Sequence, residues 1–347
     1  MARALQLASY GGSRVSPNPF VGAVIVARGR IIGEGYHRIY GQAHAEVNAV
    51  RSVAAADREL LREATMYVSL EPCSHFGKTP PCADLIIREG IPRVEVAVED
   101  PFLKDYESGI EKMRRAGVEV GVGMMRREAL EINRRFFTAH TLRRPYVLLK
   151  WAQSADGFIA GRGGTPVMFS TPYTSLLMHR ERAFCDAIMA GTGTVVCDNP
   201  RLDCRLWPTR DPRHRPLKVT FESPRYPADS LLARAGAVTM DRGEALADFL
   251  HRLYADHGVT SLMVEGGATT LGLFARERLF DEVRVEISPV ALGDGVRTPE
   301  ILPGQTPGLA AELMTGGSCA DVFGEGFRQL PTQRYDGNVI LSFVKNY

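Results

Sequence analysis

The stretch that decides the fold of the first half of the chain reads EPCSHFGKTPPCADLII (71–87). An apolar run at 65–70 predicts a buried strand directly before it, and apolar residues at helical intervals predict a helix from Cys82 to Glu89. Cys73 therefore lies in the turn after a strand, and Cys82 lies at the start of a helix. Helix N-termini and metal ions both stabilise thiolates. The two cysteines are thus candidate metal ligands.

A third candidate ligand lies upstream, in HAEVNAV (44–50). Zinc binds imidazole and thiolate ligands in tetrahedral geometry, and a catalytic site leaves one position for water. His44, Cys73 and Cys82 are therefore the predicted zinc ligands. Bound zinc lowers the pKa of water from about 16 towards about 7, which supplies hydroxide at neutral pH. Glu46, two residues beyond His44, is the predicted proton shuttle.

The order H-x-E, P-C and C is typical of zinc-dependent base deaminases, in which two residues usually separate the cysteines. Eight residues separate them here. Two other interpretations are open at this point. His44 could be a satisfied core histidine with the cysteines as small apolar fillers, or zinc could stabilise a binding module without turnover. Three ligands beside a carboxylate favour the catalytic site.

The composition indicates a globular enzyme rather than a membrane or nucleic-acid-binding protein. Apolar residues make up 45% of the chain and charged residues 24%, and the net charge is +2, so no global field attracts nucleic acid or membrane. No apolar run is long enough for a transmembrane helix, and the N-terminus lacks the features of a signal peptide. Six cysteines are too sparse for a disulfide framework. We expect a cytoplasmic protein whose partner is a small molecule.

Strand and helix patterns alternate along the chain, which predicts two α/β domains. The 347 residues are enough for two cores. The polar, basic segment HTLRRP (140–145) ends in proline and marks the boundary, with domains at 1–144 and 145–347. The expected strands are 21–26, 30–36, 65–70, 93–99, 118–122, 146–152, 186–190, 217–221, 237–240, 261–265, 281–287 and 339–344; the expected helices are 44–56, 82–89, 109–116, 126–140, 171–183, 244–257 and 269–277. The segment 200–215 is expected to be a loop.

Two glycine-rich turns follow expected strands in the second half. They are AGTGT (190–194) and the start of VEGGATTLGLF (264–274), where Thr269 and Thr270 open a helix. Backbone N–H groups at a helix N-terminus bind phosphate, and glycines allow close approach. Such turns also form ordinary strand-to-helix corners. No G-x-G-x-x-G follows the first strand, which disfavours a standard dinucleotide-binding fold.

The first half resembles the deaminase half of the bifunctional deaminase/reductase family of riboflavin biosynthesis. The resemblance rests on PNPFVGAVIV (17–26) and on the segments 44–50 and 71–87, and in that family the long cysteine spacing is normal. It implies a cytidine-deaminase-like three-layer domain and a diaminohydroxypyrimidine substrate that carries a phosphoribosylamino group. It also implies that Asn18 contacts the substrate, and that His75 and Lys78 are either phosphate ligands or solvated loop residues.

The second half resembles the reductase half of the same family, whose fold is similar to dihydrofolate reductase and whose cofactor is NADPH. The resemblance rests on KWAQSADGFIA (150–160), CDAIMAGTGTVVCDNPRLDCR (185–205) and the segment 264–274. It implies NADPH contacts from Ala152, Thr194, Asp198, Ser223, Gly267, Ala268, Thr269, Thr270, Leu271, Gly272 and Leu273, and substrate contacts from Arg182, Leu202, Arg205 and Glu265. Leu202 could instead be a core residue, and Arg182 a surface residue.

The chain departs from the family pattern at two places. After Asp100 and Pro101 it reads FLKDYESGIEKM, where the family has Asn-Pro and a glycine-rich stretch. In the second half, Pro166 and Met168 occupy positions where the family has serine and tryptophan, so a hydroxyl group and an aromatic face are lost. Substrate contacts from both segments are left open.

The resemblance implies a two-step reaction in riboflavin biosynthesis. Hydrolytic deamination of the pyrimidine comes first, and reduction of the ribose to a ribityl chain by NADPH follows. A homodimer formed through the reductase domain is also implied. The alternative is a zinc deaminase that acts on another nucleoside or on an RNA base, with a second domain that is not a reductase.

Overall fold

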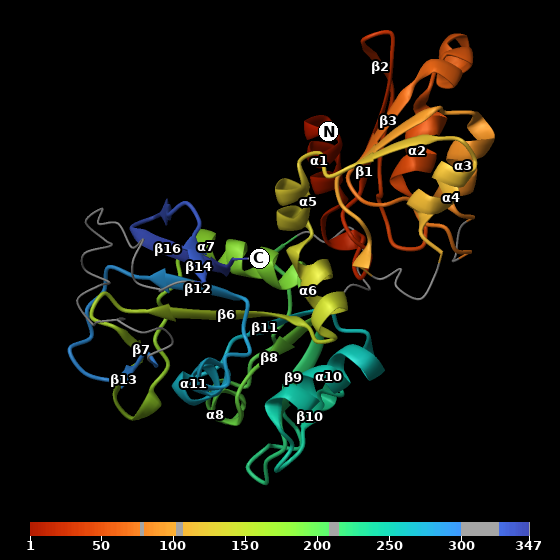
Figure 1. Cartoon of the computed structure of the whole chain (residues 1–347). Coiled ribbons are helices and arrows are strands. Elements are labelled where there is room, and N and C mark those ends of the chain that lie inside the picture. Colours follow the sequence, from red (N-terminus) through yellow and green to blue (C-terminus); the bar gives the residue numbers. More distant parts are fainter. Residues whose placement is uncertain (77–79, 102–106, 208–214, 300–325, 347) are drawn as a thin grey trace. The chain divides into compact units, whose positions relative to one another are not determined.

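The computed structural model describes residues 1–76, 80–101, 107–207, 215–299 and 326–346. The chain divides into two compact units, Met1–Arg143 and Arg144–Tyr347, each built around its own sheet (Figure 1). Both units combine helices with a mixed sheet, which confirms the predicted α/β class. The units are described separately below.

The first unit contains a five-stranded sheet in the order β2-β1-β3-β4-β5. β1 (Gly22–Ala27) and β2 (Arg30–Tyr36), both predicted as strands, form a hairpin, and positive φ angles at Arg28 and Gly29 suit its two-residue turn. β3 (Thr65–Val68) pairs antiparallel with β1. β4 (Arg93–Val96) and β5 (Glu119–Val122) continue the sheet in parallel.

Helices cover both faces of this sheet, because alternate residues of β1 point into two cores. Ala23 and Ile25 pack in the larger core with residues of α2 (Ala45–Ser52), α3 (Cys82–Glu89) and α4 (Gly109–Arg115). Val24 faces the other way and packs on α1 (Ala2–Ala8). Figure 1 shows α2, α3 and α4 together on one side of the strands. This is the expected three-layer arrangement.

Two predicted helices of the first unit are wrong in their extent. The helix expected over 44–56 ends at Ser52, and a separate 3-10 helix covers Ala55–Glu63. The helix expected over 126–140 is two helices, α5 (Arg126–Ile132) and α6 (Arg134–Leu142), which meet at Asn133. The Asn133 side chain accepts a hydrogen bond from the Phe20 N–H at 2.7 Å and donates one to the Phe20 carbonyl at 2.8 Å. This tertiary contact holds Asn133 at φ −109° and ψ 19°, outside the helical region, and breaks the helix.

The second unit contains a larger sheet in the order β10-β9-β8-β11-β6-β12-β16-β14. The strands from β10 to β12 run parallel, and β16 pairs antiparallel with β12. The strands of this sheet are β6 (Tyr146–Gln153), β8 (Ala187–Met189), β9 (Leu217–Phe221), β10 (Val238–Met240), β11 (Ser261–Val264), β12 (Glu282–Ile287), β14 (Phe327–Gln329), β15 (Gln333–Tyr335) and β16 (Asn338–Lys345). A separate pair joins β7 (Phe158–Ala160) to β13 (Val296–Arg297).

Helices again supply a core on each face of the sheet. Val147, Leu149 and Trp151 of β6 pack in a core with α10 (Leu246–His257) and α11 (Ala268–Arg276). Leu148 points to the opposite core, which holds residues of α8 (Thr192–Asp198) and α9 (Leu231–Arg234), with α7 (Pro172–Ala183) packed beside them. The parallel strands therefore alternate between two buried faces, as the crossover connections require.

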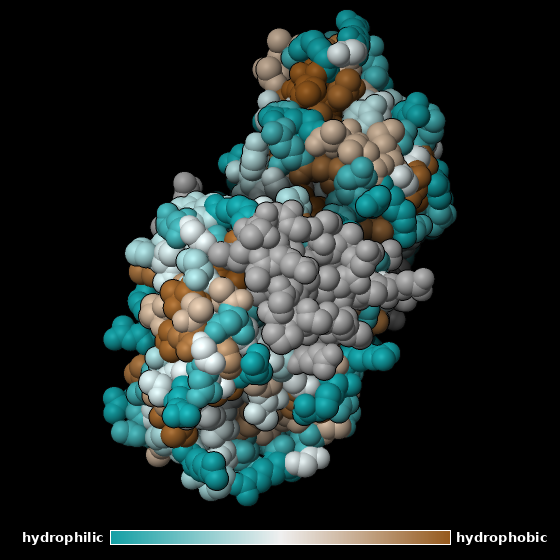
Figure 2. Space-filling view, turned by 90° about the vertical axis from the view of Figure 1, so that its left-hand side faces the viewer, coloured by the Kyte–Doolittle hydropathy of each residue, from teal (hydrophilic) through white to brown (hydrophobic). Residues whose placement is uncertain are grey.

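Among the residues that are coloured in Figure 2, hydrophilic and apolar residues are interspersed on the face drawn. Among the helices in the described part of the chain, none has the length and apolar character that a membrane-spanning helix needs.

Candidate active sites

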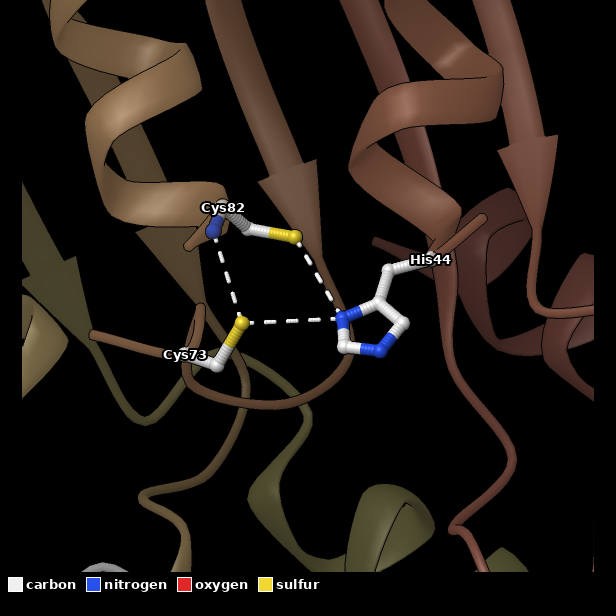
Figure 3. A group of neighbouring side chains, drawn as sticks. All are labelled: His44, Cys73 and Cys82. Atoms are coloured by element: carbon white, nitrogen blue, oxygen red, sulfur yellow. Dashed lines mark hydrogen bonds between the residues drawn. The ribbon is translucent and has the colours of Figure 1, made fainter. Parts of the chain in front are cut away.

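Three elements of the first unit bring the predicted zinc ligands together. His44 precedes the first turn of α2, Cys82 is the first residue of α3, and Cys73 lies in the segment that follows β3 (Figure 3). Each cysteine Sγ lies 3.5 Å from His44 Nδ1. The three ligand atoms all lie within 4.8 Å of one another. Two sulfurs and one imidazole nitrogen thus surround a common point.

The electrostatics of the cluster suit a cation. Hydrogen bonds from Cys82 and His44 lower the pKa of the Cys73 thiol to about 4, and the Cys73 thiolate in turn raises the pKa of His44. Cys82 donates to Cys73, which raises the pKa of Cys82 well above its usual range. A bound metal deprotonates its thiol ligands outright. The donor set and its three-ligand count fit a catalytic zinc ion, which keeps a fourth position for water.

Glu46 lies in the first turn of α2 beside this cluster and is only 3% exposed. Burial raises the pKa of its carboxyl group to about 7. A carboxyl group with a pKa near the working pH both accepts and donates protons readily. Glu46 therefore has the environment that proton transfer requires.

The cluster opens into a pocket of about 370 Å³ at one edge of the sheet. Asn18, His37, His44, Glu46 and His75 are among its lining residues. The His37 Nδ1 lies 3.2 Å from the Ala43 carbonyl, and its Nε2 lies 3.2 Å from the Asn18 amide nitrogen. Burial lowers the pKa of His37, so the neutral ring donates to the carbonyl and accepts from Asn18. His37 therefore fixes which way the Asn18 amide faces. Lys78, a predicted phosphate ligand, lies outside the described residues.

Sequence reasoning missed several residues of this pocket. His37 follows β2, Glu71 follows β3 and Asp100 follows β4. The sequence could have indicated these three residues, because each follows a strand and the three strand ends share one edge of the sheet. Ligands of α/β proteins bind at such an edge. Glu71 accepts hydrogen bonds from Ser108 Oγ at 2.6 Å and from the Asp100 N–H at 3.1 Å, so it fixes both flanks of the segment 101–107. Tyr40, Gln42, Phe136 and His140 also line the pocket.

The candidate NADPH contacts of the second unit gather at the carboxyl ends of the parallel strands. Thr194 and Asp198 lie in α8, which follows β8, and Ser223 follows β9. Ala152 lies near the end of β6, and the segment 267–273 begins α11 after β11. β9, β8, β11 and β6 are neighbours in the sheet, so these ends form one edge.

Two glycine-rich turns approach each other at this edge. A Cβ atom at Gly191 would lie 2.3 Å from Thr270 Oγ1, and one at Gly266 would lie 2.5 Å from Thr270 Cβ, so only glycine allows this contact. Gly267 is the N-cap of α11, and backbone N–H groups of the first turn are directed out of the helix end. Thr270, Leu271 and Gly272 are buried, and Leu271 packs in the core. The backbone at the start of α11 is therefore better placed than the Leu271 side chain to contact a phosphate.

The candidate substrate residues of the second unit form a polar network. Arg182 in α7 donates two hydrogen bonds to the Glu265 carboxylate, at 2.6 and 2.7 Å, and one to the Asp203 carbonyl at 2.9 Å. Both partners of the pair are largely buried, so the alternative of Arg182 as a surface residue is wrong. Leu202 is 2% exposed and packs in a core at a positive φ of 44°, whereas Arg205 is exposed.

Two further ionisable residues lie beside this network. Burial lowers the pKa of Lys150, which interacts with Glu265 and Glu286. Glu286 accepts hydrogen bonds from Ser170 Oγ at 2.7 Å and from the Asn338 amide at 2.6 Å. Lys150 and Glu286 were not predicted, because single charged residues inside apolar strands carry no motif. Met168, at the position where the resemblance implies a tryptophan, is 84% exposed.

Comparison with known proteins matches one family model to each half of the chain. Residues 1–98 match the family model of the cytidine and deoxycytidylate deaminase zinc-binding region, and residues 145–314 match that of the RibD C-terminal domain. The riboflavin biosynthesis protein RibD of Aquifex aeolicus is 39% identical over 85% of this chain and 88% of its own length. That of Bacillus amyloliquefaciens is 36% identical over 88% of this chain and 87% of its own length.

Solved structures agree as well. RibD of Acinetobacter baumannii superposes with a TM-score of 0.83 at 28% identity and covers 100% of this chain and 98% of its own. A diaminohydroxyphosphoribosylaminopyrimidine deaminase/5-amino-6-(5-phosphoribosylamino)uracil reductase of Thermotoga maritima superposes with a TM-score of 0.78 at 30% identity, covering 100% and 97% of the two chains.

A zinc deaminase unit joined to an NADPH-dependent reductase unit defines a bifunctional enzyme. The chain belongs to the RibD family of riboflavin biosynthesis. This confirms the fold class, the paired deaminase and reductase activities, and the two cofactors, Zn²⁺ and NADPH, that the sequence predicts.

Proposed function

We propose that residues 1–144 deaminate a diaminohydroxypyrimidine carrying a phosphoribosylamino group, and that residues 145–347 then reduce the ribose of the resulting uracil derivative to a ribityl chain. The observation that carries this proposal is the meeting of His44, Cys73, Cys82 and Glu46 at one pocket. The name of the Thermotoga maritima protein supports the choice of substrates. The alternative is a deaminase that acts on another nucleoside or an RNA base, with a second domain that is not a reductase. The match of residues 145–314 to the RibD C-terminal domain disfavours it.

In the deaminase step, His44, Cys73 and Cys82 would hold zinc, which when bound would supply the nucleophile by lowering the pKa of water. Glu46 takes one proton from the attacking water on a carboxylate oxygen and gives it to the ring nitrogen. It then takes the second proton from the hydroxyl group newly bonded to the ring carbon and gives it to the amine, which departs as ammonia. The buried position of Glu46 keeps bulk water away from this transfer. Asn18, held by His37, hydrogen-bonds the substrate. His75 and Lys78 bind its phosphate.

In the reductase step, NADPH supplies a hydride to C1 of the ribose in its open imine form. The first turn of α11 and the 190–194 turn would hold its phosphates, and Ala152, Thr194, Asp198 and Ser223 would complete the cofactor site. Arg182, Arg205 and Glu265 hold the substrate through their side chains, and Leu202, whose side chain packs in the core, contributes only through its backbone. We propose Lys150 as the donor of the proton that the imine nitrogen takes up, because burial lowers the pKa of Lys150 and so favours release of its proton.

We also propose the partners and location of the enzyme. A small-molecule substrate rather than a nucleic acid is supported by a net charge of only +2. Cytoplasmic action is supported by the lack of a disulfide among the described cysteines. A homodimer formed through the second unit is implied by the family. Sedimentation at micromolar concentration tests the dimer, and a monomer there contradicts it.

A coupled assay with the phosphoribosylaminopyrimidine tests the proposed order. Ammonia release and NADPH oxidation are followed separately. We expect ammonia release without NADPH, and NADPH oxidation only after deamination or with the deaminated compound. NADPH oxidation that does not depend on deamination would contradict the proposed order.

A further inference from the structure

One wall of the deaminase pocket comes from a helix outside the matched zinc-binding region. That region covers residues 1–98, whereas Phe136 and His140, which line the pocket, lie in α6 (Arg134–Leu142). The two residues are four positions apart, so they share one face of the helix. Their rings meet edge to face with centroids 4.4 Å apart. Phe136 is buried and His140 is partly buried.

The position of this wall is fixed against the loop that carries Asn18. Asn133, at the start of α6, is 2% exposed and pairs with both the N–H and the carbonyl of Phe20. Pro17, Asn18 and Pro19, just before Phe20, line the same pocket. Two hydrogen bonds from one rigid amide leave little freedom for the start of α6 to move relative to this loop. The two walls of the pocket are therefore held as a unit.

The chemistry of the two side chains suits a flat heteroaromatic ring. An aromatic ring such as Phe136 packs favourably on the face of another ring. Burial lowers the pKa of His140 to about 4, so its imidazole is neutral at pH 7, with one nitrogen that donates and one that accepts. A diaminohydroxypyrimidine offers both amino donors and a carbonyl acceptor at its edge.

We propose that Phe136 and His140 contact the bound pyrimidine directly, Phe136 through its ring face and His140 through a ring nitrogen, and that α6 thereby helps to select the substrate. This inference rests on the proposed function of the pocket as the deaminase site. It adds two binding residues that the zinc motif does not contain.

The test uses the zinc-loaded full chain and measures kcat and KM for ammonia release. Because a contact made equally in ground and transition states affects binding alone, His140→Ala and Phe136→Leu should raise KM about three- to tenfold with kcat within twofold. His140→Gln, which keeps one donor and one acceptor, should recover part of the loss. Thr141→Ala, at an exposed position of the same helix, is the matched control and should match the parent.

Zinc content and the reductase turnover of the same preparations show whether the chain is intact. An unchanged KM in both His140→Ala and Phe136→Leu would overturn the inference. So would a loss of zinc and kcat in His140→Gln as well as in His140→Ala, because that pattern indicates a structural role. Failure of the proposed function is a separate result: it shows as ammonia release that persists in Glu46→Gln.

Discussion

Arg182 and Glu265 form a largely buried ion pair in which two guanidinium nitrogens lie 2.6 and 2.7 Å from the two carboxylate oxygens. Although burial alone would raise it, the pKa of Glu265 is held below its usual range by Arg182. The pair joins α7 to the end of β11, at the edge where the candidate cofactor and substrate residues gather.

Removing one partner of this pair should cost both stability and reduction. Arg182→Met leaves a buried carboxylate without its cation, so the free energy of unfolding should fall by about 3–5 kcal/mol. The double variant Arg182→Met/Glu265→Gln should recover much of that stability but no reductase activity. Chemical denaturation and NADPH oxidation measure the two effects. Arg180→Met, at an exposed position of α7, is the control. Recovery of reductase activity in the double variant would contradict a substrate-binding role.

The Asn133 amide should matter for the stability of the first unit. Asn133→Ala leaves the N–H and carbonyl groups of Phe20 without these partners, which should lower the free energy of unfolding by about 1–3 kcal/mol. Thermal loss of deaminase activity should therefore occur at a lower temperature, while loss of reductase activity is unchanged. If both activities are lost at the parent temperatures, the two hydrogen bonds contribute nothing to stability.

The break at Asn133 also shows what the sequence could not reveal. The apolar pattern runs through Asn133 without interruption, and its partner Phe20 is 113 residues away. The pocket wall formed by Phe136 and His140 depends on the same distant contact. By contrast, His44, Cys73 and Cys82 could be predicted, because each belongs to a local motif at a strand end or helix start.

α8 (Thr192–Asp198) illustrates a second limit. Its sequence TGTVVCD contains a glycine and β-branched residues, which have low helix propensity, so the sequence predicts only the glycine-rich turn at 190–194 and no helix after it. Val195 is 1% exposed and packs in the core beneath the sheet. Tertiary packing therefore overrides the local preference, and this could not be predicted without the neighbouring strands.

Removal of zinc should separate the two activities. Cys82→Ala deletes a fully buried candidate ligand, so zinc content and ammonia release should both fall to background. The second unit has its own core, so NADPH oxidation with the deaminated substrate should stay within twofold of the parent. Metal analysis and the two assays on one preparation check this. Parallel loss of both activities would argue against independent sites.

Two histidines, the partly buried His140 and the buried His179, should make stability depend on pH. Burial lowers the pKa of His140 and of His179 from 6.5 to about 4. Below pH 6.5 the unfolded chain binds protons that the folded chain does not, so stability is full above that pH and falls as pH drops towards 4. Thermal unfolding between pH 7 and 5 measures the slope, which His140→Gln/His179→Gln should reduce. An equal slope in the double variant would exclude these histidines as its source.

The most direct test of the central claim is ammonia release by Glu46→Gln with zinc content measured on the same sample. Glutamine keeps the size of the side chain but cannot carry a proton, and general acid–base catalysis by one group contributes about 10²–10⁴-fold. The account predicts full zinc occupancy, loss of ammonia release by at least about 100-fold, and unchanged reduction of the deaminated substrate. Ammonia release at the parent rate by the zinc-loaded variant would contradict it.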